Sequence, residues 1–449
     1  MAASIQATKP VVTGDDTALR TPRVPAAMPA CDPLPMASSF QHIGYAARIA
    51  FVVELAERLH TYGTTAQRLE GALVSVSQTL GLDCEPMANP TGMVLTFSDP
   101  TRPAGESDTT RVIRVPPGDD DLAKLCEADR IAEDVMAERI GLAEGYAALR
   151  ALDRPARRRD QVLRALAFGL SAASVAGLLR LPWLDIATAG GIGVLVGAID
   201  WASSSRPRLR EASEALSSMV AATVAIAVAA LVGPLNLNTV IIAALIVLMP
   251  GMTLTNAFNE LTSQHLVSGM ARIAGAMSTM LKLTVGTMIA LMAAQALGIE
   301  PHVRALRPQP HWVEWCALAT GGLAFAVLFR AARRDWPLVI VAAMSGYVIT
   351  RVVGDDWGGP VGIFVAALVL TAGGNAYARW TQRPGALVRV PGIILMVPGS
   401  SSVRGVLTLI QQQDFAAGQQ AALAVINILL ALIAGLLFGN LLLPTRRNL

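Results

Sequence analysis

Long apolar stretches, each close to the length of a membrane-spanning helix, fill the chain from about residue 160 onward. A helix needs about 20 mostly apolar residues to cross the hydrocarbon core of a bilayer. Short polar turns separate these stretches, so the sequence predicts a mostly helical membrane protein with ten spans. The expected spans are 163–181, 183–201, 214–233, 236–252, 270–298, 312–330, 336–353, 359–379, 388–402 and 418–443.

Charged residues are distributed unevenly along the chain. They make up 15% of the sequence, whereas a typical soluble protein contains about a quarter. Of the 33 acidic residues, 21 precede residue 160, so a polar N-terminal region is followed by an apolar one. This pattern excludes a single soluble globule, a small disulfide scaffold and a wholly disordered chain. The stretch 1–38 is rich in proline and lacks an apolar core, so we expect a disordered tail without a signal peptide.

Arginine accounts for 33 of the 36 basic residues, and most arginines lie at the ends of apolar stretches. Basic residues are concentrated in the cytosolic loops of membrane proteins. With ten crossings, the arginine-rich segments fall on one side of the membrane, whereas the turn at 233–235 on the other side is uncharged. We therefore expect both termini in the cytosol, an inner (plasma) membrane location, contact with membrane lipid and no binding of nucleic acid. The arginine-rich segments are 154–164, 206–210, 330–334, 379–389 and 446–447.

A small cytosolic α+β domain is expected at 40–152. Apolar residues recur at helical spacing in four segments, and three short runs after the second helix are typical of strands. Asp119, Asp120 and Asp121 precede the third helix. Helix capping explains this run better than a metal site does, because no further carboxylates recur at ligand spacing. The helices are expected at 42–60, 66–80, 122–139 and 142–152, and the strands at 84–87, 93–97 and 111–115.

The sequence contains no motif of a soluble enzyme or of an ATP-driven pump. The region 40–150 lacks Gly-x-Ser-x-Gly, His-Glu-x-x-His and any Cys/His pair at catalytic spacing, and the chain lacks a Gly-x-x-x-x-Gly-Lys-Ser/Thr phosphate-binding loop. The four cysteines form neither a Cys-x-x-Cys pair nor a zinc pattern, so we expect reduced thiols, no metal and no cofactor. We therefore expect that the protein is not an enzyme.

One short motif occurs in both halves of the membrane region. Leu248-Met249-Pro250-Gly251 returns as Met396-Val397-Pro398-Gly399, and a polar stretch follows in both places. The motif lies in the fourth and the ninth expected span, so each half, 160–300 and 311–445, contains five spans. Because five is odd, the halves would have opposite orientations, giving 5+5 inverted repeats. Inverted repeats and discontinuous helices are typical of secondary transporters.

The Pro-Gly pairs indicate where a small molecule would bind. Proline removes a backbone donor and glycine lets the chain turn, so each pair predicts a broken helix whose restart exposes free N–H groups. Such a helix N-terminus favours a carboxylate, and neighbouring polar groups would bind the rest of the molecule. The alternative is that each pair only ends a helix at the membrane surface. The candidate binding residues are Pro250, Gly251, Thr253, Thr255, Asn256, Glu260, Pro398, Gly399, Ser400 and Ser401.

Ionisable and amide side chains inside the expected spans are further candidates. Asp200, beside Trp201 at the end of the second span, and Lys282, within the fifth span, are candidates for coupling ion movement to transport. For Asp200 the alternative is a charge that simply reaches the membrane surface. Asn375 in the eighth span is a candidate ligand of the substrate, although such an amide more often joins two helices.

Taken in order, these motifs resemble the threonine/serine exporter family over about residues 42–443. The resemblance implies ten spans, a cytosolic N-terminal domain and export of threonine and serine driven by the proton-motive force. Some relatives divide the two halves between separate polypeptides and are associated with dicarboxylate export. The family pattern has aspartate where this chain has Glu260, which keeps the acid but changes its reach. The similarity lies in Gly63–Glu70, Leu80–Leu82, Arg114–Val115, Asp121–Leu125, Met249–Asn256, Gly269–Arg272 and Val397–Ser400.

The sequence therefore predicts a secondary exporter of small hydroxy amino acids, with threonine, serine and protons as its small-molecule partners. Three alternatives stay open: an exporter of dicarboxylates or other small metabolites, a membrane-anchored hydrolase, and a channel with a regulatory cytosolic domain. Dependence of the flux on a proton gradient would distinguish the exporter from the channel. The oligomeric state is also open, and a homo-oligomer is one alternative.

Overall fold

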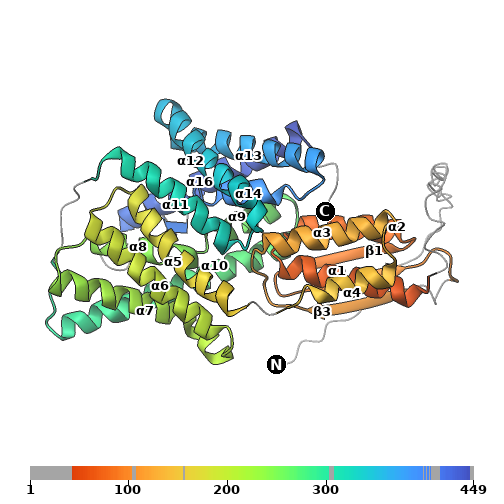
Figure 1. Ribbon diagram of the computed structural model, residues 1–449, viewed down its shortest axis with the longest axis horizontal. Coiled ribbons are helices and arrows are strands. Elements are labelled where there is room, and N and C mark those ends of the chain that lie inside the picture. Colours follow the sequence, from red (N-terminus) through yellow and green to blue (C-terminus); the bar gives the residue numbers. More distant parts are fainter. Residues whose placement is uncertain are drawn as a thin grey trace, which may run out of the picture. The chain divides into compact units, whose positions relative to one another are not determined.

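The computed structural model describes residues 43–103, 108–154, 157–302, 308–397 and 415–444, together with 399, 400, 402, 403 and 405. The expected tail at 1–38 and the two site candidates Pro398 and Ser401 lie outside this described part. Figure 1 shows a small module of helices and strands followed along the chain by a bundle of long helices.

The N-terminal module confirms the expected α+β organisation. Its three strands form an antiparallel sheet in the order β1-β2-β3, with Cys84 opposite Phe97 and Leu95 opposite Arg111. Met93, Leu95 and Phe97 alternate along the central strand and are buried in a core that the helices share, because alternate strand side chains point to the same face. The elements are α1 (Tyr45–Thr61), α2 (Ala66–Thr79), β1 (Asp83–Asn89), β2 (Gly92–Ser98), β3 (Thr109–Arg114), α3 (Leu122–Met136) and α4 (Leu142–Ala151).

Two polar contacts fix the ends of the module's helices. The buried Arg48 of α1 donates to the carbonyl of Leu80 at 3.0 Å, at the end of α2, and forms an ion pair of 2.6 Å with the buried Asp99. Asp121 caps α3, as expected, by accepting a hydrogen bond of 3.0 Å from the Lys124 amide. The end of α2, the segment after β2 and the start of α3 are therefore held in defined positions.

The described part contains eight helices that are long and apolar enough to cross a membrane, or nine if one bent pair counts as a span. In that pair α8 (Leu237–Ala244) meets the segment 246–262 at an angle of 59°. The mostly helical architecture is thus confirmed. The ninth expected span, 388–402, includes residues outside the described part, so ten spans stay a prediction. The long helices are α5 (Arg158–Leu178), α6 (Trp183–Ser203), α7 (Pro207–Leu231), α10 (Leu266–Ala296), α11 (His311–Leu328), α12 (Trp336–Trp357), α13 (Gly359–Thr381) and α16 (Phe415–Leu442).

Shorter elements lie at the centre of the bundle and at its turns. The segment after α8 consists of a 3-10 turn, Ile246–Leu248, and helix α9 (Gly251–Thr262). A second 3-10 turn, Arg333–Asp335, precedes α12, and α14 (Ala386–Ile393) precedes the second Pro-Gly pair. At about 1.5 Å per residue, helices of eight residues such as α8 and α14 are too short to cross a bilayer alone.

The helices before and after residue 305 use corresponding pairings. Helix α5 packs on α6, α6 on α7, and α7 on α10, whereas α11 packs on α12, α12 on α13, and α13 on α16. The short α8 contacts α5, α6 and α7, and the short α14 contacts α11, α12 and α13. The first helices of the two groups, α5 and α11, contact each other. An internal repeat of five segments would produce this correspondence, while the inverted orientation of the halves stays a prediction.

Glycines allow the long helices to approach closely. A Cβ atom added to Gly193 of α6 would lie 2.8 Å from the Phe168 carbonyl oxygen and 2.9 Å from the Gly169 Cα of α5. A Cβ on Gly439 of α16 would lie 2.9 Å from the Leu368 carbonyl oxygen of α13. Helices in membranes associate through such small-residue faces, because the lipid provides little hydrophobic drive between helices.

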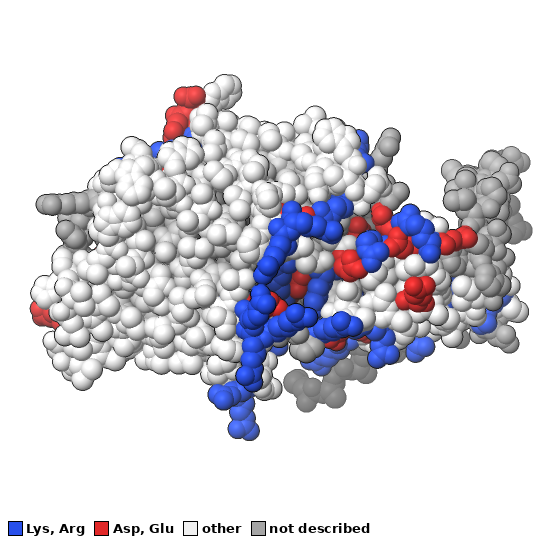
Figure 2. Space-filling view, viewed as in Figure 1, with Lys and Arg blue, Asp and Glu red and all other residues white. Residues whose placement is uncertain are grey.

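Charge is concentrated at one end of the bundle. Figure 2 shows lysine and arginine side chains gathered in a band beside the N-terminal module, while the rest of the helical surface in this view is nearly uncharged. The helices expose large apolar residues, including Leu281, Met292 and Val341. An uncharged apolar surface of this kind is what a bilayer would cover.

The glycine packing gives a test of the helical bundle. We expect Gly193→Leu to destabilise the protein by about 1–3 kcal/mol or more, because an overpacked side chain forces α5 and α6 apart. Gly191 is the matched control, since a Cβ atom there has nothing within 4 Å and the residue is exposed on the same helix. The thermal stability of both variants in detergent is the measurement. Equal stability of Gly193→Leu and Gly191→Leu would contradict the close packing of α5 and α6.

Candidate functional site

The first Pro-Gly pair breaks the chain as the sequence predicts. Pro250 precedes α9 with backbone angles of −80° and 41°, and the Gly251 amide bonds to the Met249 carbonyl at 2.8 Å. The first helical hydrogen bond of α9 runs from the Leu254 amide to the Pro250 carbonyl at 3.0 Å. The amides at the start of α9 therefore lie before the first hydrogen bond of the helix. The positive end of the helix dipole lies at the break.

The two Pro-Gly motifs, far apart in the sequence, meet in space. A Cβ atom added to Gly251 would overlap Val397 and lie 3.1 Å from the Gly399 amide nitrogen. A Cβ atom added to Gly399 would lie 3.3 Å from the Gly251 Cα. A side chain at Gly251 would therefore overlap its neighbours, and a side chain at Gly399 would require them to shift. The break before α9 and the segment after α14 thus form one junction between the two halves of the membrane region.

A cavity of about 990 Å³ lies at this junction. Gly251, Met252 and Thr253 from the first break line it together with Gly399 and Ser400 from the second. Apolar side chains form other parts of its wall, including Phe325 and Phe329 of the α11 end. A large, mainly apolar cavity with a few polar groups and a helix N-terminus is the usual form of a small-molecule site.

The N-terminal module forms one wall of this cavity. Its loop Gly118–Asp120 lines the cavity beside Arg164 and Arg330. The Leu122 amide donates to the Phe329 carbonyl at 3.0 Å, and Asp121 lies 3.4 Å from Arg330. The loop between β3 and α3 is therefore attached to the end of α11.

Asp120 is the acid of this loop whose pKa is raised toward neutral pH. It lines both the large cavity and a neighbouring one, and no described residue forms a hydrogen bond or an ion pair with its carboxylate. Burial, reinforced by the negative charge of Asp119, raises the pKa of Asp120 to about 6, while Arg272 acts in the opposite direction. Asp120 can therefore gain or lose a proton close to neutral pH.

Glu260 lies outside the large cavity and is fully buried. Its carboxylate accepts hydrogen bonds from the Ala66 amide at 3.0 Å and from Ser268 at 2.7 Å, and it pairs with Arg272 at 2.9 Å. The Ala66 amide belongs to the first turn of α2, so Glu260 serves as an acceptor for the start of that helix. Its contacts are with the protein, and they attach the module to the corner between α9 and α10.

Other predicted residues are distributed around α9. Thr253 lines the large cavity, whereas Thr255 and Asn256 line a neighbouring cavity of about 280 Å³ between the module and α9. Thr255 is buried, and its hydroxyl has no hydrogen-bond partner among the described residues. These positions place hydroxyl and amide groups on both sides of the first turn of α9.

Three predicted residues lie in helix contacts. Asn375 donates to the Asn440 side chain at 2.9 Å and to the Leu443 carbonyl at 2.7 Å, so it joins α13 to α16. Lys282 of α10 lies 3.4 Å from Glu214 of α7. Asp200 lies 3.4 Å from Arg164, which in turn lines the large cavity.

The sequence did not single out several groups that line these cavities. The run Asp119–Asp121 indicates a helix cap, and no chemical motif identifies Arg68, Arg330 or Arg389 as a ligand. A weak signal existed for Arg68, which lies within the motif Gly63–Glu70. Within the described part of the chain, His, Cys, Asp and Glu residues form no group of three that could hold a metal ion.

Comparison with known families covers both halves of the chain. A family model described as "Putative threonine/serine exporter" matches residues 50–294, and a model described as "Threonine/Serine exporter, ThrE" matches residues 314–442. The first match runs from within α1 of the N-terminal module into α10, and the second runs from within α11 to the end of α16. No solved structure matches the chain significantly.

Several curated relatives from fungi carry the name "Pheromone-regulated membrane protein 10". The protein of Debaryomyces hansenii is 22% identical over 388 residues, which cover 82% of this chain and 37% of the relative. Those of Zygosaccharomyces rouxii and Eremothecium gossypii are 24% and 23% identical, over 82% of this chain and 38% and 50% of the relatives. The chain thus spans half or less of the length of these proteins. Because the first family model alone covers more than half of the sequence, this chain belongs to the threonine/serine exporter family of membrane transporters.

Proposed function

We propose that this protein exports threonine and serine from the cytosol through the cavity at the two Pro-Gly breaks. The observation that carries the proposal is the meeting of Gly251 and Gly399 at a cavity of about 990 Å³. Discontinuous helices that meet between two repeats are where secondary transporters bind their substrates. The corresponding helix pairings of the two halves support inverted repeats as the basis of this arrangement.

The groups around the cavity suit a hydroxy amino acid. The substrate carboxylate would bind at the start of α9, where the helix dipole is positive. The side-chain hydroxyl would bind to Thr253 and Ser400, which line the cavity from the two breaks. The ammonium group would bind to Asp120, whose carboxylate has no partner among the described residues, rather than to Glu260, which three protein groups already engage.

Transport would be driven by the proton-motive force, with Asp120 as the group that exchanges protons. Its pKa of about 6 suits proton binding and release near neutral pH. A coupling role for Asp200 fits its contact with Arg164 at the cavity wall, and Lys282, paired with Glu214 away from the cavity, is the weaker candidate.

The glycine junction should be essential for export. We expect Gly251→Leu to reduce threonine efflux from proteoliposomes at least tenfold, because the new side chain would occupy the place where Val397 and Gly399 meet α9. Efflux of labelled threonine, serine and malate measures both activity and substrate class. Gly275→Leu is the control, since a Cβ atom there has nothing within 4 Å.

Unchanged efflux by Gly251→Leu at normal abundance would show that the Pro-Gly pairs only end helices. Faster efflux of malate than of threonine by the wild type would favour the dicarboxylate alternative.

The charge of Asp120 should set the pH dependence of substrate binding. Above pH 6 the carboxylate is charged and attracts the substrate ammonium, so we expect the KM for threonine to rise as the cytosolic-side pH falls from 7 to 5. Asp120→Asn should have a high KM at every pH. Asp83→Asn, at an exposed position of the same module, should behave like the wild type. A pH profile of Asp120→Asn identical to that of the wild type would remove Asp120 from the site.

The raised pKa also predicts an effect on stability with a defined sign. An aspartate with an unfolded pKa of about 3.9 and a folded pKa of about 6 destabilises the folded state once it is charged. The free energy of unfolding therefore decreases as the pH rises from 4 through 6. We therefore expect Asp120→Asn to raise the melting temperature above that of the wild type at pH 8 but not at pH 4. A lower melting temperature of this variant at pH 8 would mean that the charged carboxylate stabilises the fold.

We also propose that the protein lies in the plasma membrane with both termini in the cytosol. In intact cells, a membrane-impermeant maleimide should then label Val232→Cys, which is 67% exposed at the outer end of α7, but not Ser205→Cys at the other end. Both variants require a cysteine-free background, because the native Cys316 is itself exposed. Labelling of Ser205→Cys alone would reverse the orientation.

A further inference from the structure

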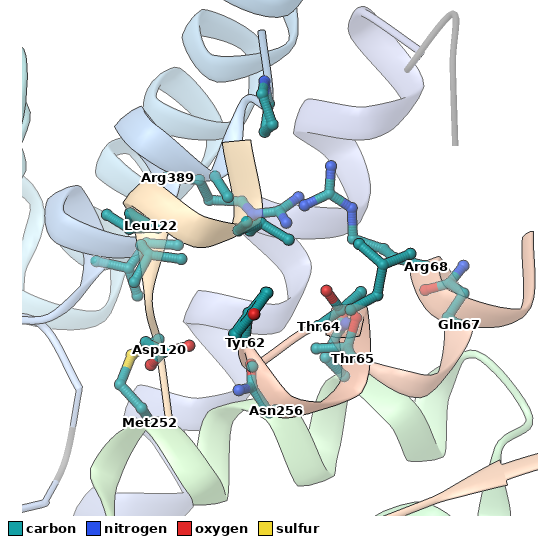
Figure 3. A pocket seen from close by; sticks show the side chains of 18 of the residues that line it. Tyr62, Thr64, Thr65, Gln67, Arg68, Asp120, Leu122, Met252, Asn256 and Arg389 are labelled. Carbon is teal, nitrogen blue, oxygen red and sulfur yellow. The ribbon is translucent and has the colours of Figure 1, made fainter. Parts of the chain in front are cut away.

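Two arginines face each other in the cavity of about 280 Å³ between the module and the helices. Arg68 lies in the first turn of α2, and Arg389 lies on α14. Figure 3 shows their guanidinium groups pointing toward one another. The charge of Arg68 acts on Arg389, and both side chains are half-buried. Two like charges that converge in a partly buried place repel each other, so the arrangement requires a compensating group.

The protein supplies little compensation at this place. Among the described residues, no hydrogen bond or ion pair involves the side chain of Arg68 or Arg389. Asp129 of α3 is the acidic residue whose charge acts on Arg68, while burial lowers the pKa of Arg68. Asp120 also lines the cavity but lies away from the two guanidinium groups (Figure 3).

Three other buried or half-buried arginines of this protein have a close carboxylate partner. Arg48 lies 2.6 Å from Asp99, and Arg272 lies 2.9 Å from Glu260. Arg383, which precedes α14 in the chain, lies 2.6 Å from Asp335. Arg68 and Arg389 have no such carboxylate partner among the described residues, and they lie together where a cavity provides room for a ligand.

The chemistry of the ligand follows from the donors. Each guanidinium presents a planar set of N–H donors that matches the oxygens of a phosphate or a carboxylate. One carboxylate would neutralise only one of the two cations, and a zwitterionic amino acid would bring no net negative charge. A phosphate monoester carries a charge of about −1.5 to −2 near neutral pH and can accept from both arginines. Thr64, Gln67 and Asn256 on the cavity wall add neutral polar partners.

We propose that Arg68 and Arg389 form a binding site for a phosphate group, separate from the substrate cavity at the Pro-Gly breaks. The phosphate belongs either to a small cytosolic molecule or to the headgroup of an anionic phospholipid. Because Arg68 belongs to the module and Arg389 to the second half of the helical bundle, a bound phosphate joins these two parts of the protein.

Inorganic phosphate tests the site on the full-length protein in detergent, at constant ionic strength with chloride as the reference anion. We expect phosphate to raise the melting temperature, since a ligand that binds only the folded state stabilises it. Arg68→Gln and Arg389→Gln should weaken phosphate binding roughly tenfold or more through loss of a charge-assisted hydrogen bond. Arg111→Gln, at an exposed position of β3, should keep the full shift.

The stability of the variants without phosphate separates a binding role from a structural one. Each substitution removes one member of a repelling pair, so neither should lower the melting temperature in chloride alone. A lower melting temperature would show that the arginines serve the fold, and it would overturn the proposal.

Nanodiscs distinguish the two sources of the phosphate group. If a lipid headgroup is the ligand, nanodiscs containing phosphatidylglycerol should stabilise the wild type more than phosphatidylcholine nanodiscs do, and Arg389→Gln should lose this difference. If a small cytosolic molecule is the ligand, inorganic phosphate should raise the melting temperature of the wild type, and the two kinds of nanodisc should stabilise it equally. The proposal is wrong if neither probe stabilises the wild type, or if both arginine variants respond as the wild type does.

Discussion

The buried carboxylate of Glu260 attaches the N-terminal module to the helical bundle. A charged group without water requires partners, and Glu260 has three: Arg272 at 2.9 Å, Ser268 at 2.7 Å and the Ala66 amide at 3.0 Å. Removal of one partner would leave a buried charge partly uncompensated, which typically costs several kcal/mol. The start of α2 is therefore fixed over the corner between α9 and α10. That position in turn places the first turn of α2, including Arg68, over the cavity beside α9.

Much of the fold follows from patterns that act over short distances. Apolar stretches of about 20 residues predict spans because the bilayer sets the length, and the long helices begin and end within a few residues of the expected limits, apart from α7. The helix α7 starts at Pro207, before the expected limit of 214, because a polar turn of helix extends beyond the apolar part. The Pro250-Gly251 break could also be predicted, since proline and glycine act on their own backbone.

The roles of the charged groups around the candidate site could not be predicted in the same way. Glu260 follows the break at a distance that suggested a substrate ligand, but one of its donors, the Ala66 amide, lies 194 residues away. A helix start needs an acceptor, and nothing local in the sequence reveals which distant carboxylate will provide it. The same holds for Asp120, whose raised pKa depends on its burial in the folded protein. Hydropathy predicts the membrane spans, whereas the partners and the pKa values of buried charged groups depend on the tertiary packing.

The module contacts both halves of the bundle, which limits how the transporter can move. One attachment, from Ala66 to Glu260, joins it to the corner of α9 and α10 in the first half. The other, from Leu122 to the Phe329 carbonyl and from Asp121 to Arg330, joins it to the end of α11 in the second half.

Alternating access requires the two halves to move against each other around the substrate. Any such movement must either break one of these attachments or bend the module between them. The Phe329 attachment lies beside the cavity, and its ion pair joins the buried Asp121 to a partly exposed Arg330, whereas Glu260 is fully buried and has three partners. The contact at α11 is therefore the one that should cost less to release. The loop that contains Asp120 would then withdraw from the cavity together with Leu122, and the cavity would open toward the side on which the module lies.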